Sequence, residues 1–216
     1  MKTIKDLKLF GVAICLDFIF LNHGNSKLTD KNSNKKIIIL YGYAGNEETH
    51  WQTWLAHKCQ SLGYDVCYPQ FPNPDNPELS AWIEHLDLIL PVLDENSIIV
   101  GHSLGCAVAF RLLEKVSVKK NKKLILVAPA NWSALKNTEL KFLKPFYENF
   151  DFERVRTKTA NIEIYIADDD PYIDSAEALD WQKQLQAKTF VIKNGGHLNV
   201  ASGFTSFPEV LNSILE

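Results

Sequence analysis

Six short runs rich in isoleucine and valine, separated by longer stretches with helical character, constrain the fold of this chain more than any other feature. The apolar runs are Ile37–Tyr41, Tyr64–Tyr68, Ser97–Gly101, Leu124–Ala128, Ile162–Ala167 and Thr189–Ile192. Their length and continuity are typical of strands buried on both faces of a parallel sheet. The other stretches predict helices at about 50–62, 78–93, 104–118, 175–187 and 207–215. Strands that alternate with helices predict a single α/β domain, a mostly parallel sheet flanked by helices.

The first 36 residues do not fit this alternation. Residues 1–8 contain three lysines, and Leu9–Leu21 is apolar apart from Gly11 and Asp17. Thirteen residues are too few to span a bilayer, so the segment is either an extra helix or strand packed on the domain, or a signal or anchor. Residues 22–36 are polar and predict a linker. We therefore divide the chain into an N-terminal extension (1–36) and a folded domain (37–216).

Charge and cysteine usage exclude several classes of protein. Lys and Arg number 23 against 26 Asp and Glu, so no basic excess exists to bind nucleic acid. The four cysteines, Cys15, Cys59, Cys67 and Cys106, form neither metal-binding pairs nor a disulfide framework. They indicate a reducing compartment, so we expect a cytoplasmic protein, with export or membrane association through residues 1–21 as the alternative. No metal or nucleotide motif is present, and we expect no metal and no cofactor.

The sequence Gly101-His102-Ser103-Leu104-Gly105 lies between a predicted strand and a predicted helix. This G-x-S-x-G pattern in a strand–turn–helix context is typical of a nucleophile elbow. The reversal exposes the Ser103 hydroxyl, and glycines are needed two positions either side because side chains there would collide. The helix N-terminus then supplies amide N–H groups and partial positive charge to a developing oxyanion.

A nucleophilic serine needs a base, and the base needs an orienting carboxylate, in the chain order Ser, acid, His on this architecture. His197 is the only histidine after Ser103, and it follows a predicted strand. Asp168, Asp169 and Asp170 follow the predicted strand before it. Asp170 is the first choice because the adjacent Pro171 restricts its backbone, and Asp169 is the next.

The second half of the oxyanion hole is expected in the loop after the first core strand. That strand leads into Gly42-Tyr43-Ala44-Gly45, so the amides of Tyr43 and Leu104 are the candidate donors. Trp51 and Trp54 are expected in the core or in a pocket wall. The segment 69–77, with four prolines, predicts a rigid extended loop that either borders the pocket or is purely structural.

Several of these motifs together resemble the retinoblastoma-binding-protein-9-like branch of the α/β-hydrolases. The matching segments are Tyr41-Gly42-Tyr43, His50-Trp51-Gln52-Thr53-Trp54-Leu55, Pro69-Gln70-Phe71-Pro72-Asn73-Pro74, Gly101-His102-Ser103-Leu104-Gly105-Cys106, Asp169-Asp170-Pro171 and Gly196-His197-Leu198-Asn199. The resemblance implies a nearly lidless α/β-hydrolase fold, with Ser103 as nucleophile, Asp170 as orienting acid and His197 as base. Tyr41 departs from it, because many α/β-hydrolases have histidine there.

The sequence therefore predicts a cofactor-free serine hydrolase, most naturally a carboxylesterase acting on small acyl esters. A peptidase or a thioesterase with the same residues is an alternative, and so is a binding protein that keeps the fold without turnover. The interval 131–160, rich in aromatic residues, predicts a short helical cap or packed loop rather than a large lid. The partner expected is a small acyl substrate, and the sequence points to no particular protein partner.

Overall fold

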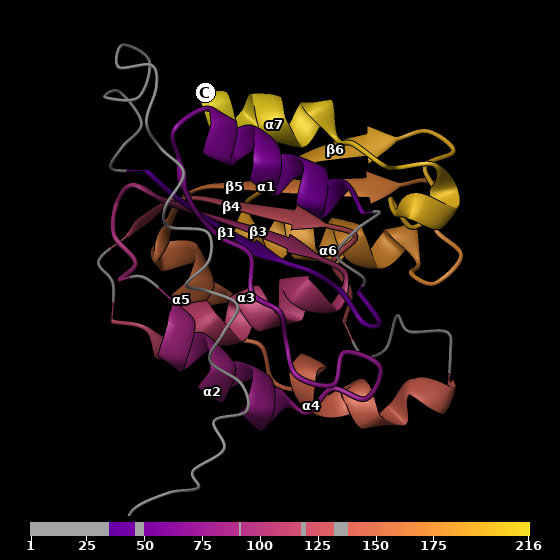
Figure 1. The fold of residues 1–216 in the computed structure, drawn as a ribbon. Helices are drawn as coiled ribbons and strands as arrows, with labels where there is room; N and C mark the ends of the chain where they lie inside the picture. The colour runs from indigo at the N-terminus through magenta and orange to yellow at the C-terminus, as the bar shows by residue number, and fades with distance from the viewer. Residues whose placement is uncertain (1–34, 46–49, 91, 118–119, 132–137) are drawn as a thin grey trace, which may run out of the picture.

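A computed structural model of the chain describes residues 35–45, 50–90, 92–117, 120–131 and 138–216 (Figure 1). The interpretations of residues 1–34 and of Trp132 lie outside the described residues. The strands are β1 (Lys36–Leu40), β2 (Asp65–Cys67), β3 (Ser97–His102), β4 (Asn121–Val127), β5 (Thr159–Ala167) and β6 (Lys188–Ile192). The α-helices are α1 (Trp51–Ser61), α2 (Leu79–Ile89), α3 (Leu104–Lys115), α4 (Lys144–Tyr147), α5 (Phe152–Thr157), α6 (Ser175–Leu185) and α7 (Pro208–Leu215). The 3-10 helices of the described residues are η2 (Thr138–Leu143) and η3 (Val200–Ser202).

The described strands form one six-stranded sheet with the order β2-β1-β3-β4-β5-β6. Every pairing is parallel; Ile38 of β1 is in register with Ile99 of β3, for example. The α/β fold predicted from the sequence is confirmed. Because all strands run the same way, the loops after β1, β3, β5 and β6 meet at one edge of the sheet.

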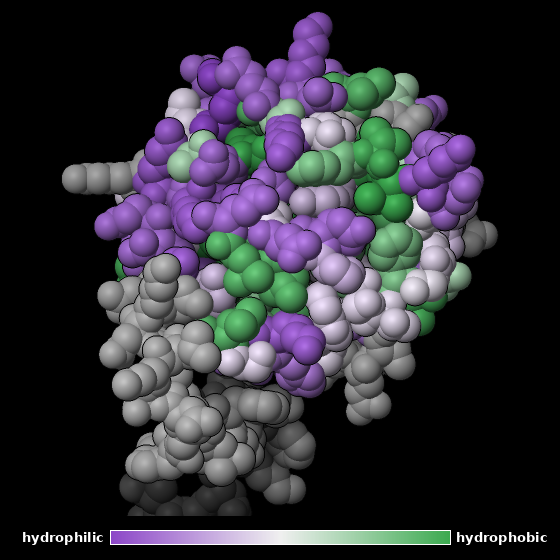
Figure 2. Space-filling view, turned by 90° about the horizontal axis from the view of Figure 1, so that it is seen from above, coloured by the Kyte–Doolittle hydropathy of each residue, from purple (hydrophilic) through white to green (hydrophobic). Residues whose placement is uncertain are grey.

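Alternate residues of the buried strands face two separate hydrophobic layers. Ile37 and Ile98 pack with α1 and α7, whereas Ile38 and Ile99 pack with α2–α6. Figure 1 shows α1 and α7 above the sheet and helices α2 to α6 below it. Hydrophilic side chains cover much of the α1 and α7 face, with apolar side chains in separate groups among them (Figure 2). Both faces of the sheet are thus covered, which explains the continuous apolar runs.

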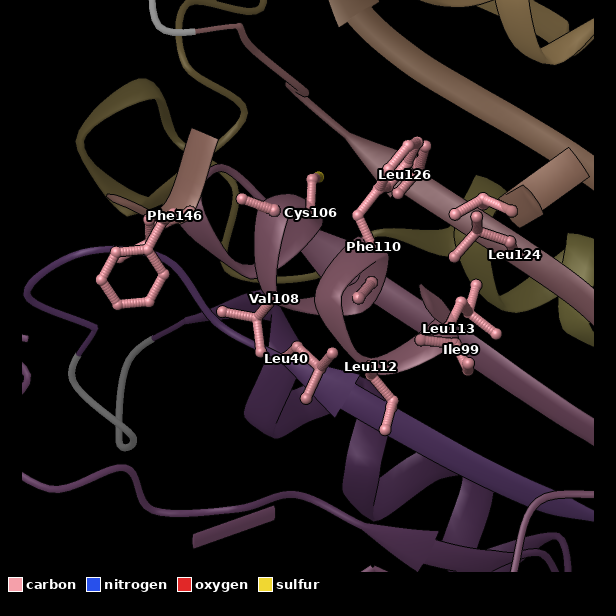
Figure 3. Close-up of a cluster of buried hydrophobic side chains, with 14 of the residues drawn as sticks. Leu40, Ile99, Cys106, Val108, Phe110, Leu112, Leu113, Leu124, Leu126 and Phe146 are labelled. Carbon is pink, nitrogen blue, oxygen red and sulfur yellow. The ribbon is translucent and has the colours of Figure 1, made fainter. Parts of the chain in front are cut away.

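Helix α3 fixes the lower layer. Its side chains lie among those of β1, β3 and β4, and the labelled residues include Leu40, Phe110 and Leu126 (Figure 3). Phe110 is fully buried and contacts the Trp181 ring at a centroid distance of 4.7 Å. The helix that follows the predicted elbow is therefore held rigidly against the sheet.

Several predicted boundaries were wrong. Strands β4 and β5 begin at Asn121 and Thr159, three residues before the apolar runs. These polar residues pair across the sheet, and Thr159 Oγ1 donates to Asn121 Oδ1 at 2.9 Å, so tertiary hydrogen bonds extend the strands where hydrophobicity does not. Helix α2 ends at Ile89 rather than 93, because Leu90 is extended before a proline in the sequence. Helix α3 ends at Lys115 rather than 118, where the β-branched Val116 is extended.

Tyr41 packs against the proline-rich loop after β2. Its hydroxyl accepts a hydrogen bond from the Phe71 amide at 2.7 Å. Phe71 in turn stacks on Trp82 at 4.1 Å, and the Trp82 indole donates to the Pro72 carbonyl at 2.9 Å. The loop is therefore held by ring packing and by hydrogen bonds to two residues outside it, Tyr41 and Trp82. Tyr41 is the residue that departs from the family pattern.

The described part of the interval 131–160 is helical and packed. It contains η2, α4 and α5, whose Leu143, Phe146 and Val155 are buried in the layer below the sheet. The prediction of a short helical cap or packed loop is confirmed for these residues. Within the described residues, no helix combines the length and apolar character that a bilayer crossing requires.

Candidate active site

Ser103 occupies the single position between β3 and α3. Its backbone has φ 53° and ψ −120°, a conformation that residues other than glycine rarely adopt. A Cβ on Gly105 would lie 2.1 Å from the Leu40 carbonyl oxygen, and one on Gly101 would lie 2.8 Å from the Gly105 carbonyl oxygen. The two glycines therefore allow α3 to begin directly against β1 and β3, which holds Ser103 at the tip of the turn.

His197 lies between Ser103 and Asp170, although these residues are far apart in sequence. Ser103 Oγ is 3.0 Å from His197 Nε2, and His197 Nδ1 is 2.8 Å from Asp170 Oδ2. The two partner side chains are almost buried, with 10% of His197 and 5% of Asp170 exposed. The structure thus brings the three predicted residues into one hydrogen-bonded chain, and its order is that of a nucleophile, a base and an orienting acid.

The three adjacent aspartates hold three different groups. Asp168 Oδ1 accepts from the Asn194 amide at 2.8 Å. Asp169 Oδ1 accepts from the Gly196 amide at 2.7 Å. Asp170 is the one whose carboxylate reaches the imidazole. The geometry therefore favours Asp170 over Asp169 as the candidate orienting acid.

Two backbone amides fix the Asp170 carboxylate. Its Oδ1 accepts from the amides of Tyr172 and Ile173 at 2.8 and 3.2 Å, which leaves Oδ2 directed at His197. The Tyr172 ring also stands edge-on to the imidazole at 5.0 Å. The turn that follows Pro171 therefore orients the Asp170 carboxylate and covers one side of the His197 ring.

Two residues hold the loop that carries His197 through its backbone carbonyls. Neither contact was predicted from the sequence. His102 Nε2 lies 3.0 Å from the His197 carbonyl oxygen, and Trp51 Nε1 donates to the Leu198 carbonyl at 2.8 Å. Leu198 has a φ of 50°, so this backbone is strained and needs such anchors. The sequence did contain one signal for the His102 contact. A histidine at the end of a strand that is buried on both faces needs a buried hydrogen-bond partner.

His102 is neutral at physiological pH. Burial, assisted by the neighbouring His197, lowers the pKa of His102 to about 3. A carbonyl oxygen can only accept, so the neutral ring carries its hydrogen on Nε2 and donates it to His197. The expected location of Trp51 in the core is confirmed, because its side chain is fully buried.

A pocket of about 60 Å³ opens beside Ser103. The residues that line it are Tyr41, Gly42, Tyr43, Gly45, His50, Gln52, His102, Ser103, His197 and Asn199. Tyr43, the first predicted oxyanion donor, is in this wall, and Leu104, the second, is the buried first residue of α3. A Cβ on Gly42 would lie 3.0 Å from Ser103 Cβ, so the loop after β1 passes close to the elbow.

A wider hollow lies near this pocket. It has a volume of about 520 Å³ and is lined by Asn76–Ser80, Phe142 and Pro145. The Tyr43 ring of the pocket wall contacts the Phe142 ring of this hollow at a centroid distance of 5.7 Å, so the two rings lie between the two spaces. Among the described residues, no group of three or more histidine, cysteine or acidic side chains is arranged to hold a metal ion.

Comparison with known proteins places these features in a family. The YdeN protein of Bacillus subtilis is 29% identical over 177 residues, which cover 82% of this chain and 92% of YdeN. Serine hydrolase RBBP9 of Rattus norvegicus is 27% identical over 168 residues, covering 76% and 88% of the two chains. A Mycoplasma pneumoniae protein named as an esterase/lipase 3 is 42% identical over 121 residues, covering 50% of this chain and 41% of that protein.

The likeness extends to the fold. The crystal structure of the B. subtilis ydeN gene product matches with a TM-score of 0.77 and 28% identity, covering 84% of this chain and 97% of that chain. The family model described as serine hydrolase matches residues 37–216. The chain belongs to the serine hydrolase family and has its α/β-hydrolase fold.

Proposed function

We propose that this chain is a serine carboxylesterase that cleaves small acyl esters with Ser103, His197 and Asp170. The observation that carries this proposal is the continuous hydrogen-bonded chain from Ser103 Oγ through the imidazole to Asp170. The strained backbone of Ser103 supports it, because such strain is typical of functional positions.

In the first half of the reaction, His197 Nε2 takes the hydroxyl proton while Ser103 Oγ attacks the ester carbonyl carbon. Asp170 holds Nδ1–H and stabilises the imidazolium that forms. The amides of Tyr43 and Leu104 would donate to the oxyanion. His197 then gives its proton to the leaving alkoxide, and the carbon–oxygen bond breaks to release the alcohol.

In the second half, water takes the place of the alcohol. His197 removes a proton from this water, which attacks the acyl–Ser103 carbonyl through the same oxyanion site. Collapse of the intermediate returns the proton to Ser103 Oγ and releases the carboxylic acid. Every proton in this cycle passes through one imidazole nitrogen, which is the atom that faces Ser103.

Two observations favour a small ester. The pocket beside Ser103 measures about 60 Å³, room for a short substituent only. The relative from M. pneumoniae, 42% identical over the shared 121 residues, carries an esterase/lipase name. Thioesters and amides could be attacked by the same groups, and they belong in the substrate panel.

A fluorophosphonate probe tests the proposal directly. The purified wild-type chain should be labelled and should hydrolyse short esters, whereas Ser103→Ala should lose both properties and keep its fold. Ser61→Ala is the matched control, because Ser61 is exposed at the end of α1. Labelling that persists in Ser103→Ala would show that another residue is the nucleophile. Labelling of the wild type without turnover of any ester, thioester or amide would favour a binding protein.

A further inference from the structure

Gln52 is a buried polar residue in the wall of the catalytic pocket. It lies in the first turn of α1, its exposure is 1%, and it lines the same pocket as Ser103 and His197. Its Oε1 has no hydrogen-bond partner within the part of the chain that the structure describes. Buried amide oxygens in folded proteins are almost always paired, so this atom calls for a partner that the described part of the chain does not supply.

Other polar side chains line the pocket together with glycines and tyrosine rings. His50 and Asn199 lie in it with Gln52, and burial lowers the pKa of His50, so that its ring is neutral near pH 7. Asn199 Oδ1 already accepts from the amide and the hydroxyl of Ser202. Of these three side chains, Gln52 is the one whose buried oxygen has no hydrogen-bond partner among the described residues, and a purely alkyl group in this pocket would leave that acceptor unpaired.

We propose that the pocket selects esters that carry a hydroxyl group close to the reacting carbonyl, and that Gln52 Oε1 accepts its hydrogen bond. The inference rests on the esterase function proposed above and names its substrate class: esters of small hydroxy acids or of small polyols. The pocket is lined both by Tyr43 of the predicted oxyanion loop and by His197, so the hydroxyl can belong to the acyl or to the alcohol part.

The experiment compares hydroxyl esters with fluoro esters, which match them closely in size and electron withdrawal but cannot donate a hydrogen bond. One pair is ethyl 2-hydroxypropanoate and ethyl 2-fluoropropanoate; the other is 2-hydroxyethyl and 2-fluoroethyl propanoate. The ratio of kcat/KM within each pair is measured for the wild type, for Gln52→Met and for Gln60→Met. Gln60 is the matched control because it is exposed on the same helix.

The hydroxyl preference is the kcat/KM of the hydroxyl ester divided by that of the fluoro ester. For at least one pair, this preference should be about tenfold greater in the wild type and in Gln60→Met than in Gln52→Met. A tenfold change is the effect of one neutral hydrogen bond. The fluoro esters make no hydrogen bond to Gln52, so the loss of kcat/KM in Gln52→Met should be larger for the hydroxyl ester than for the fluoro ester of the same pair. Equal losses for both members of each pair would overturn the proposal and assign Gln52 a structural role. The same hydroxyl preference in Gln52→Met and in the wild type would overturn it too.

The wild type alone provides a second test, should Gln52→Met fail to fold. Hydrolysis of the fluoro esters without a preference for either hydroxyl ester contradicts the role of Gln52 and leaves the esterase function intact. If the wild type is labelled by the fluorophosphonate but hydrolyses none of the four esters, the esterase function is contradicted instead. The two failures therefore give different results.

Discussion

At the scale of single residues, changing each of the three aspartates to asparagine should affect activity differently. Asp170→Asn presents an amide to the His197 ring and favours the wrong tautomer, which should lower kcat by about 10⁴, as in a serine protease with the equivalent change. Asp168 and Asp169 accept from backbone amides, and an asparagine oxygen can still accept. Asp168→Asn and Asp169→Asn should therefore keep most of the activity.

The measurement is kcat and kcat/KM of the three purified variants with one short ester. Thermal unfolding of each variant checks that the fold is kept. If Asp169→Asn were the crippling change and Asp170→Asn the mild one, the assignment of the orienting acid would be wrong.

His102 should make the folded state less stable in mild acid. Its pKa is about 3 in the folded chain, against about 6.5 in an unfolded one. Between these values the unfolded state binds the extra proton, so the free energy of unfolding falls as the pH falls below about 6.5. The slope from this one residue is at most about 1.4 kcal/mol per pH unit. His102→Gln, whose amide can still donate to the His197 carbonyl, should flatten the dependence.

Urea unfolding of the wild type and of His102→Gln at pH 7, 6 and 5 checks this prediction. Some slope should remain in the variant, because burial also lowers the pKa of His50 and of His85. Parallel stability curves for the two proteins would show that His102 does not carry the effect. His102→Leu, which cannot donate to the loop, should lose more activity than His102→Gln.

At the scale of elements, a buried ionic cluster attaches α7 to the sheet. Lys123 of β4 contacts Glu163 of β5 at 3.3 Å and also donates to the carbonyl and the hydroxyl oxygen of Ser213 in α7. Ser213 Oγ and the Tyr165 hydroxyl donate to Glu163 at 2.6 and 3.0 Å. Burial opposes the charged carboxylate, but these bonds prevail and lower the pKa of Glu163.

Removing one charge of this cluster should be more harmful than removing both. Glu163→Leu leaves Lys123 buried without its counter-charge and should lower the free energy of unfolding by about 3–5 kcal/mol. The double variant Lys123→Met/Glu163→Leu should recover much of that loss, because no buried charge remains. Denaturant unfolding measures both proteins. A double variant as unstable as the single one would contradict this account.

One residue just before α7 links this helix to the loop that carries His197. Phe207, just before α7, packs on the Trp51 ring at 5.4 Å, and Trp51 holds the Leu198 carbonyl. Elements on opposite ends of the chain thus support one loop. We expect the single variant to lose activity at temperatures where most of the protein is still folded.

At the scale of the whole molecule, the chain between β4 and β5 is part of the packed body. Leu143, Phe146 and Tyr147 are buried under the sheet face, so the described part of this segment cannot swing away as a lid without exposing core side chains. We therefore expect hydrolysis of dissolved short-chain esters without interfacial activation. The rate with tributyrin should rise smoothly across its solubility limit, and a sharp increase at emulsion formation would contradict the expectation.

The sequence by itself determined the α/β class, the parallel sheet and the nominated serine, histidine and aspartate. These follow from local patterns: continuous apolar runs, two glycines around Ser103, and the chain order of the three residues. Such patterns reflect backbone sterics and burial, which act over a few residues.

Only the tertiary structure decided how the site is held. The bonds from His102 and Trp51 to the loop and the separate hydrogen bonds of the three aspartates are contacts between distant segments. That Gln52 Oε1 finds no partner among the described residues also depends on how such segments meet. The polar starts of β4 and β5 depended on the same kind of contact. A hydrogen bond leaves no periodic signal in the sequence, because its partners are chosen by the way the strands and loops meet in space.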